Sequence, residues 1–279
     1  WFKPAYPAVS FLSLKASYSL TADRGPASVT NSRVVIKSET PWRPSAGDQE
    51  SALYVADLAN AALTYEKKHE FNVGAAVGFI DNRINVEFDW YKRNNYDLIG
   101  PVTTQGIGGQ IIKFGNIASM ESSGVEFTLS TVNISTKNFK WTTDFIYSHA
   151  TNKVTSLENR QRIIDLVSGT GFALEGYPVR SIFSIPFEGL NEKGLPTFKD
   201  QDGNVTTTGI YFQEREKIDF LEYSGTADPT DFGSFGNTFQ WKGLKLNIFL
   251  TYSFGNVVRM DPVFRKGYTD LTSMPREFR

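Results

Sequence analysis

Residues 200–204 have the types and spacing that could bind a metal ion. They read Asp-Gln-Asp-Gly-Asn, with oxygen ligands at alternate positions, as at the start of an EF-hand calcium loop. Such a loop carries a glutamate at its twelfth position, but Tyr211 stands there. An Asp-Gly pair is also an ordinary turn signal, and we favour the turn. The sequence therefore predicts no resident cofactor, with a weak alternative of Ca²⁺ near Asp200, Asp202 and Asn204.

Glu87 and Asp89 form a carboxylate pair on one strand face, within about 7 Å of each other by strand rise. Glycoside hydrolysis needs two carboxylates that oppose each other across the scissile bond, whereas these two are neighbours on one strand. His69 and His149 have no metal-ligand spacing, so we expect solvated or lumen-facing side chains. These residues favour a lining surface over a catalytic site.

Two further enzyme motifs are missing from the sequence. No Gly-x-Ser-x-Gly nucleophile elbow occurs, and GIGGQ at 106–110 lacks the Lys-Ser/Thr end of a phosphate loop. We therefore predict that the protein is not an enzyme.

Composition limits the remaining classes. The chain has 279 residues, a formal net charge of −1 and no cysteine. This charge predicts no nucleic-acid partner, and the lack of cysteine rules out a disulfide framework or a thiolate site. No apolar run of 18 residues exists, which excludes a spanning helix. The mean hydropathy of −0.29 remains compatible with a β-barrel, whose strands are only half apolar.

Strict alternation of apolar and polar residues is the main structural signal. In 71–79 the residues Phe71, Val73, Ala75, Val77 and Phe79 share one face, and 84–91 alternates in the same way. A period of two indicates β-strands. The same pattern recurs at 11–20, 123–130, 138–148, 235–241 and 244–254, and we count eight or nine strands in all. Several continue for about ten residues, the length that crosses a bilayer at a tilt.

The connections alternate between short and long. Short turns are expected at 81–83, 135–138 and 242–243, and long loops at 21–67, 99–122 and 156–180. Short turns on one rim and long loops on the other are typical of an outer-membrane barrel. The fold class predicted is therefore all-β, an antiparallel transmembrane β-barrel. The alternative is a soluble β-rich module, such as a glycan-binding module, in which the same apolar faces form a core.

Parity assigns side chains to the two faces of the predicted sheet. Aromatic residues on the apolar side near the short turns are expected to form the periplasmic-rim girdle in contact with lipid: Phe79, Phe139, Trp141, Phe239 and Trp241. Polar residues on the opposite face are the lumen-lining candidates: Glu87, Asp89, Tyr91, Glu126, Lys140, Asp144 and Lys245. Trp42, in the first long loop, could stack on a sugar, although we favour packing within its loop.

The identities of the residues in the strands are more specific than the alternation of apolar and polar positions. The run LTYEKKHEFNVGAAVGFIDNRINVEFDWYKRNNYDLI at 63–99 resembles the barrel signature of SusC-like (SusC/RagA family) TonB-dependent outer-membrane transporters of the Bacteroidota. Further stretches agree with that family in order and spacing, namely 14–25, 114–130, 138–157, 175–206 and 235–256. The resemblance therefore covers most of the chain.

The resemblance implies a function and partners. Members of the family import oligosaccharides or peptides across the outer membrane, with a SusD-like surface lipoprotein as a lid and TonB acting on a plug domain. They are about three times longer or more, with large, 22-stranded plugged barrels. We therefore expect this chain to be a C-terminal portion of one barrel domain over 1–279, with plug, N-terminal segments and final strands missing. A passive porin-like channel is the alternative within the membrane class.

One stretch does not fit strict alternation of strand direction. Strands at 179–189 and 235–241 would both run toward the short-turn rim. Either an opposite strand lies between them, for example at 209–216, or one of the two does not span.

Overall fold

The computed structural model describes residues 8–25, 33–40, 47, 50–103, 105–106 and 112–260. The chain divides into two units, each described separately. The first comprises 1–160, 174–179 and 230–254, and the second comprises 161–173, 180–229 and 255–279. Trp42 lies outside the described residues.

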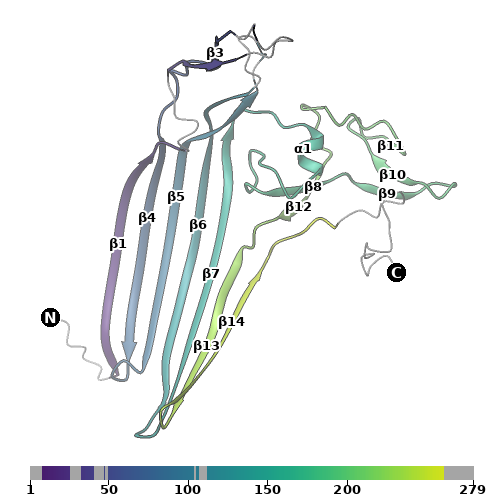
Figure 1. Cartoon of the computed structure of the whole chain (residues 1–279). Helices are drawn as coiled ribbons and strands as arrows, with labels where there is room; N and C mark the ends of the chain where they lie inside the picture. Colours follow the sequence, from purple (N-terminus) through teal and green to yellow (C-terminus); the bar gives the residue numbers. More distant parts are fainter. Residues whose placement is uncertain are drawn as a thin grey trace. The chain divides into compact units, whose positions relative to one another are not determined.

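The first unit is built on one antiparallel sheet of seven long strands (Figure 1). Their order across the sheet is β1-β4-β5-β6-β7-β13-β14, so β1 and β14 form its two edges. The strands are β1 (Val9–Asp23), β4 (Glu66–Phe79), β5 (Ile84–Thr103), β6 (Ile112–Ser135), β7 (Phe139–Leu157), β13 (Asp231–Trp241) and β14 (Leu244–Phe254). A hairpin of β2 (Val35–Glu39) and β3 (Ala52–Asp57) also belongs to this unit.

Three short turns lie at one end of the sheet, as the sequence predicts (Figure 1). They join β4 to β5, β6 to β7 and β13 to β14. The last contains only Lys242 and Gly243, with φ of 44° and 91°. Two consecutive positive φ values are typical of a type I′ turn, whose twist matches that of the flanking strands. In the β6–β7 turn, Thr136 Oγ1 accepts the backbone N–H of Phe139 at 3.0 Å.

The register keeps the two faces of the sheet consistent from strand to strand. Val73 pairs with Trp90, and Trp90 pairs with Val125, so the apolar residues of three strands stand in one row. The neighbouring row runs Gly74, Asp89, Glu126 and carries polar residues. Few of the described side chains in this sheet are buried, and large apolar ones such as Leu14 and Leu250 are 77% and 60% exposed.

The long loop predicted at 99–122 is wrong. The β5–β6 ladder continues through that region and pairs Ile99 with Asn116 and Thr103 with Ile112. Register shifts between Asn95 and Leu98 and again between Leu98 and Ile99 interrupt the alternation. Bulges of this kind place an extra residue in one strand and change which residues share a face. The parity rule therefore fails here although the strands continue.

The predicted count of eight or nine strands is also too high for this sheet, which has seven. The segment 179–189 does not cross it: β8 (Ser181–Ser184) belongs to the second unit and pairs with β12 (Glu222–Thr226). β7 pairs directly with β13, so no strand is needed at 209–216, and the structure has none there. Strand direction alternates without a gap.

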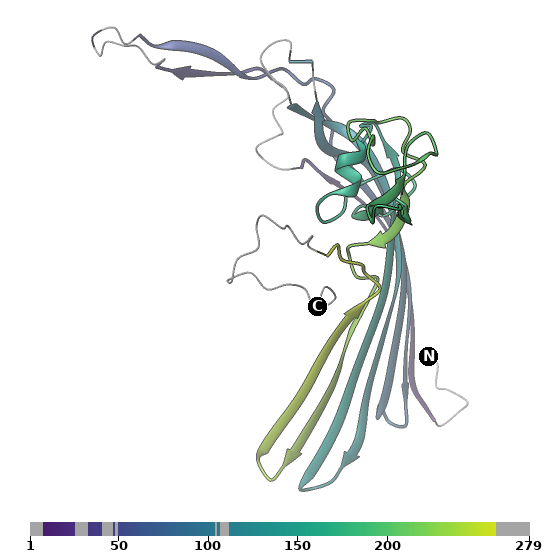
Figure 2. The same cartoon turned by 90° about the vertical axis from the view of Figure 1, so that its right-hand side faces the viewer.

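The second unit consists of a short helix and two small sheets. Its elements are α1 (Ile163–Val167), the β8–β12 pair, and a three-stranded sheet of β9 (Phe187–Leu190), β10 (Pro196–Lys199) and β11 (Val205–Thr206). Ile163 and Leu166 on α1 are fully buried, and Phe183 on β8 is nearly so. Among the described residues no helix is long and apolar enough to cross a membrane. Figure 2 shows the same elements after a quarter turn.

Arg162 and Asp165 hold the start of α1. The Asp165 carboxylate accepts the Arg162 backbone N–H at 3.1 Å and two guanidinium N–H groups at 2.9 and 2.7 Å. The hydrogen bonds from the Arg162 side chain hold the pKa of Asp165 below its ordinary value. Because the folded pKa is depressed, this contribution to stability is complete above the ordinary aspartate pKa and is lost as the pH falls through the folded value.

We predict that Asp165→Asn destabilises α1 by about 1 kcal/mol at neutral pH, as loss of a helix cap does. Hydrogen exchange of the α1 amides should accelerate about fivefold. Asp219→Asn, at an exposed position of the same unit, is the control and should leave exchange unchanged. Equal exchange in both variants would contradict the role of the pair.

Candidate transport wall

The seven predicted lumen-lining residues lie on one face of the seven-stranded sheet. Asp89 pairs with Glu126, and Glu126 pairs with Ser148. Nearer the short turns, Gln240 lies between Lys140 on one side and Lys245 on the other. Glu87, Tyr91 and Asp144 fall in alternate positions of the same strands. We call this surface the polar face. Their shared face follows from the register, whereas its exposure to a lumen remains a prediction.

A salt bridge crosses a whole strand at the centre of the polar face. Lys15 on β1 and Asp89 on β5 are both register partners of Gly74 on β4. The Lys15 Nζ lies 3.0 Å from Asp89 Oδ1. A Cβ at position 74 would lie 2.4 Å from Lys15 Cε and 2.1 Å from Asp89 Oδ1. The bridge therefore exists because glycine leaves the space between the two side chains empty.

This bridge relieves repulsion among carboxylates. Asp89 stands directly opposite Glu126 on the neighbouring strand, and like charges in that position destabilise a sheet. Glu87, two residues before Asp89 on β5, is the next side chain on the same face. Lys15 brings one positive charge to this group. Because the Lys15 side chain is 57% exposed, water and salt screen the pair and its direct contribution to stability is small. Its larger effect is to fix the position of Asp89.

A second network lies farther from the short turns on the same face. Arg93 Nε donates to Glu70 Oε2 at 2.8 Å, and Lys68 Nζ lies 3.2 Å from the same oxygen. The Arg93 guanidinium also lies 4.4 Å from the centre of the Tyr91 ring. That ring covers Gly124, where an added Cβ would lie 2.6 Å from the Tyr91 hydroxyl oxygen. Tyr91 is therefore held between a cation and a glycine, as a fixed rather than a free aromatic group.

The predicted girdle residues lie together on the apolar face near the short turns. Trp141 and Phe239 are register partners with stacked rings 5.7 Å apart, and Phe139 pairs with Trp241. Trp141 Nε1 donates to Asn237 Oδ1 at 2.9 Å, which satisfies its polar atom. Phe79 lies beside the β4–β5 turn. The shared face is as expected, and contact with lipid stays a prediction.

The metal and histidine candidates have protein partners. Asp200 Oδ1 accepts the backbone N–H groups of Asp202 and Asn204 at 3.0 and 2.8 Å, which is an aspartate turn. The N–H of Asn204 is the main cause that lowers the pKa of Asp200. Asp202 pairs with Lys217. In the other unit, the ring nitrogen Nδ1 of His69 lies 2.6 Å from the Tyr18 hydroxyl, and that of His149 lies 2.9 Å from Asp231.

No group of three or more His, Asp or Glu side chains in the described part of the chain could hold a metal ion.

Sequence reasoning missed the cross-strand partners. The alternation alone does not identify Lys15, Gly74 or the Arg93–Glu70 pair, although each lies at a polar-face position of its strand. The signal available was a glycine in the middle of a regular strand, which often marks a close approach of neighbouring groups. Which groups approach depends on the register between β1 and β4, and alternation alone does not fix that register.

Comparisons with known proteins give the class of the protein. No family model matches the chain. It is 26% identical to TonB-dependent receptor P3 of Formosa agariphila over 88% of this chain and 26% of that receptor. It is 32% identical to TonB-dependent receptor SusC of Bacteroides thetaiotaomicron over 35% of this chain and 10% of SusC. The chain spans about a quarter of the length of the first curated relatives it matches.

Solved structures agree with these relatives. The structure of the RagAB peptide transporter matches with a TM-score of 0.72 and 25% identity, over 91% of this chain and 28% of that one. The RagAB peptide importer in its closed-closed state matches with a TM-score of 0.71. With the long antiparallel strands and their two distinct faces, these matches define the chain as a segment of the transmembrane β-barrel of a TonB-dependent receptor. Within that class the chain is similar to SusC and to the RagAB transporter.

We predict that Gly74→Ala separates Lys15 from Asp89, because the new methyl group would occupy the space between them. In the full-length receptor this change should lower the thermal midpoint of the barrel, because Asp89 would then face Glu126 without the Lys15 counter-charge. Gly115→Ala on β6 is the matched control, since its Cβ would meet nothing closer than 3.5 Å. Thermal unfolding in detergent measures both. Equal midpoints would show that position 74 tolerates a side chain.

Proposed function

We propose that the protein containing this chain imports oligosaccharides or peptides across the outer membrane by a TonB-dependent mechanism. The observation that carries the proposal is the match to TonB-dependent receptors over 88% of the chain, combined with a sheet that has one apolar and one charged face. The polar face would line the lumen around the plug and substrate. The apolar face would contact lipid, with its aromatic girdle at the periplasmic rim.

A SusD-like lipoprotein is the proposed partner at the outer surface. The chain resembles both SusC and the RagAB peptide transporter. β5, β6 and β7 contain 20, 24 and 19 residues, about twice the length that crosses a bilayer. With their short turns at the periplasmic rim, their far ends would project beyond the membrane. In this arrangement they would support the surface that a lid and its substrate contact.

The orientation of the two faces can be tested with neighbouring alanines on β4. Ala75 pairs with Leu14 and Phe88 on the apolar face, and Ala76 pairs with Ser13 and Glu87 on the polar face. Arginine on a lipid-facing position near the bilayer centre costs about 2–4 kcal/mol. Ala75→Arg in the full-length receptor should therefore reduce the folded fraction in outer membranes. Ala76→Arg beside Glu87 should be tolerated. A lower folded fraction for Ala76→Arg than for Ala75→Arg would mean that the polar face, and not the apolar face, contacts lipid.

Energy dependence distinguishes active import from a passive porin-like channel. Cells that express the full-length receptor should accumulate a fluorescent oligosaccharide or peptide cargo, and loss of TonB or collapse of the proton-motive force should abolish accumulation. A passive channel would continue to equilibrate the cargo. Native mass spectrometry of the detergent-extracted complex should show an attached lipoprotein. Recovery of the protein in the soluble fraction without detergent would instead mean that the apolar face forms a core.

A further inference from the structure

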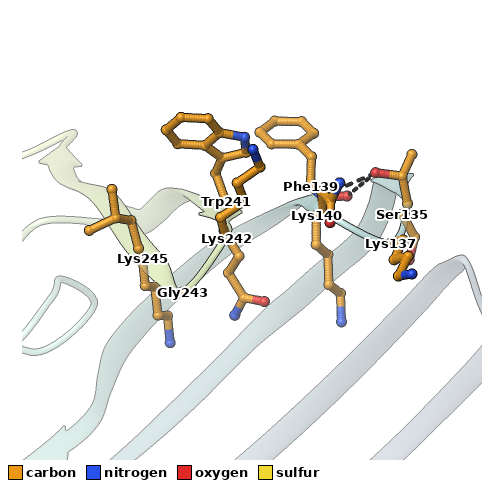
Figure 3. A pocket seen from close by; sticks show the side chains of 12 residues that line it. Ser135, Lys137, Phe139, Lys140, Trp241, Lys242, Gly243 and Lys245 are labelled. Atoms are coloured by element: carbon orange, nitrogen blue, oxygen red, sulfur yellow. Dashed lines mark hydrogen bonds between the residues drawn. The ribbon is translucent and has the colours of Figure 1, made fainter.

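Two neighbouring hairpin tips line a basic, open cavity at the short-turn end of the sheet. The cavity has a volume of about 400 Å³ and is formed by the ends of the β6–β7 and β13–β14 hairpins (Figure 3). Four of its lining residues are lysines, Lys137, Lys140, Lys242 and Lys245, and none of the lining residues is acidic. Lys140 and Lys245 belong to the polar face described above, whereas Lys137 and Lys242 lie in the two turns. We call these four residues the rim lysine cluster.

Two of the lysines stand on the same rung of the sheet. Lys140 on β7 pairs with Gln240 on β13, and Gln240 pairs with Lys245 on β14. Two strand spacings separate the lysine backbones, or about 10 Å. Figure 3 shows the side chains of Lys140 and Lys245 extending to one side of the hairpins, while the rings of Phe139 and Trp241 extend to the other. Lys140 and Lys245 therefore lie on the polar face, and the rings of Phe139 and Trp241 lie on the apolar face.

The cluster has no counter-charge within the described residues. None of the four lysines takes part in an ion pair there, and all four are exposed. Only Lys242 contacts an aromatic ring, with its Nζ 5.4 Å from the centre of the Trp241 ring. Asp144, the next carboxylate along β7, is four residues from Lys140, or about 13 Å by strand rise. Elsewhere on the same face, Lys15, Lys68 and Arg93 are each paired with a carboxylate.

We propose that the rim lysine cluster is a docking site for an acidic polypeptide segment at the periplasmic mouth of the barrel. The amines of Lys140 and Lys245 lie on the polar face, and this position favours a polypeptide over a lipid as the partner. A phospholipid headgroup would approach from the side of Phe139 and Trp241, where Lys242 contacts the Trp241 ring, whereas Lys140 and Lys245 point away from that side. Two carboxylates on an extended segment, two or three residues apart, are separated by about 7–10 Å and match the Lys140–Lys245 rung.

This inference rests on the proposed function in one respect, because it takes the polar face as the one that borders the lumen. Two amines without counter-ions repel each other, and bound carboxylates would remove that repulsion and form charge-assisted hydrogen bonds. The contact would be sensitive to ionic strength, since both lysines are solvent-exposed.

Zero-length carbodiimide coupling of the full-length receptor in native outer membranes tests the docking site. The reagent forms an amide between a lysine amine and a carboxylate, with loss of water, only where the two groups are in contact. Peptide mapping should find Lys140 or Lys245 joined to an Asp or Glu that lies outside residues 1–279 or on a periplasmic partner. The Lys140→Gln/Lys245→Gln variant should lose this product by tenfold or more. Lys193→Gln, at an exposed turn lysine of the second unit, should retain it.

Three results would overturn the proposal. One is acetylation of both lysines by an amine reagent with no coupled product, which would mean an unoccupied surface. A second is coupling only to Asp81 or Asp144, which would make the contact internal to this sheet. The third is an anionic phospholipid that native mass spectrometry finds on the receptor and that the double variant loses, which would assign the cluster to lipid. Because coupling does not depend on transport, failed uptake with intact coupling would count against the proposed function alone.

Discussion

The backbone hydrogen-bond ladder of the seven-stranded sheet is the constraint on which the rest of the structure depends. Once the register between two strands is set, each residue is assigned to a face together with its partner, so the charged and apolar surfaces form as continuous areas. In hydrocarbon every backbone N–H and C=O must be paired within the protein, which makes the ladder obligatory and not merely favourable. The Lys15–Asp89 bridge across Gly74 depends directly on it, because three strands must be in register for the charges to meet.

The same ladder explains why glycine occurs inside strands that otherwise have strong β-propensity. Gly124 lies beneath the Tyr91 ring, and Gly233 lies beneath Tyr252, whose hydroxyl donates to the backbone carbonyl of Ile146 at 3.0 Å. A strand glycine normally weakens a sheet because it has no side chain to pack. Here a neighbouring tyrosine covers the exposed backbone. One such pair lies on each face of the sheet.

Much of the sheet could be predicted from the sequence, because strand faces and short turns are determined by residues that are close together in the chain. The alternation of 71–79 and 84–91 places every side chain on its face, and the short turns are marked by Asp81-Asn82 and Lys242-Gly243. The prediction failed where local information ends. Asp97 has a φ of 59° within a bulge, so the part of β5 that follows it does not alternate and its sequence resembles that of a loop. The bridge at Gly74 needs Lys15 to pair with a residue 59 positions later in the sequence, which no local pattern records.

The direct pairing of β7 with β13 has a consequence for how this chain can change. β7 ends at Leu157 and β13 begins at Asp231, yet the two strands are neighbours over eleven residue pairs. Most of the intervening stretch belongs to the second unit, whereas 174–179 belongs to the first and hydrogen-bonds to Val154 of β7. The length and sequence of the part in the second unit can therefore vary while the eleven residue pairs between β7 and β13 stay in place. Insertions or deletions in the second-unit part of this stretch therefore need not change the register of the seven-stranded sheet.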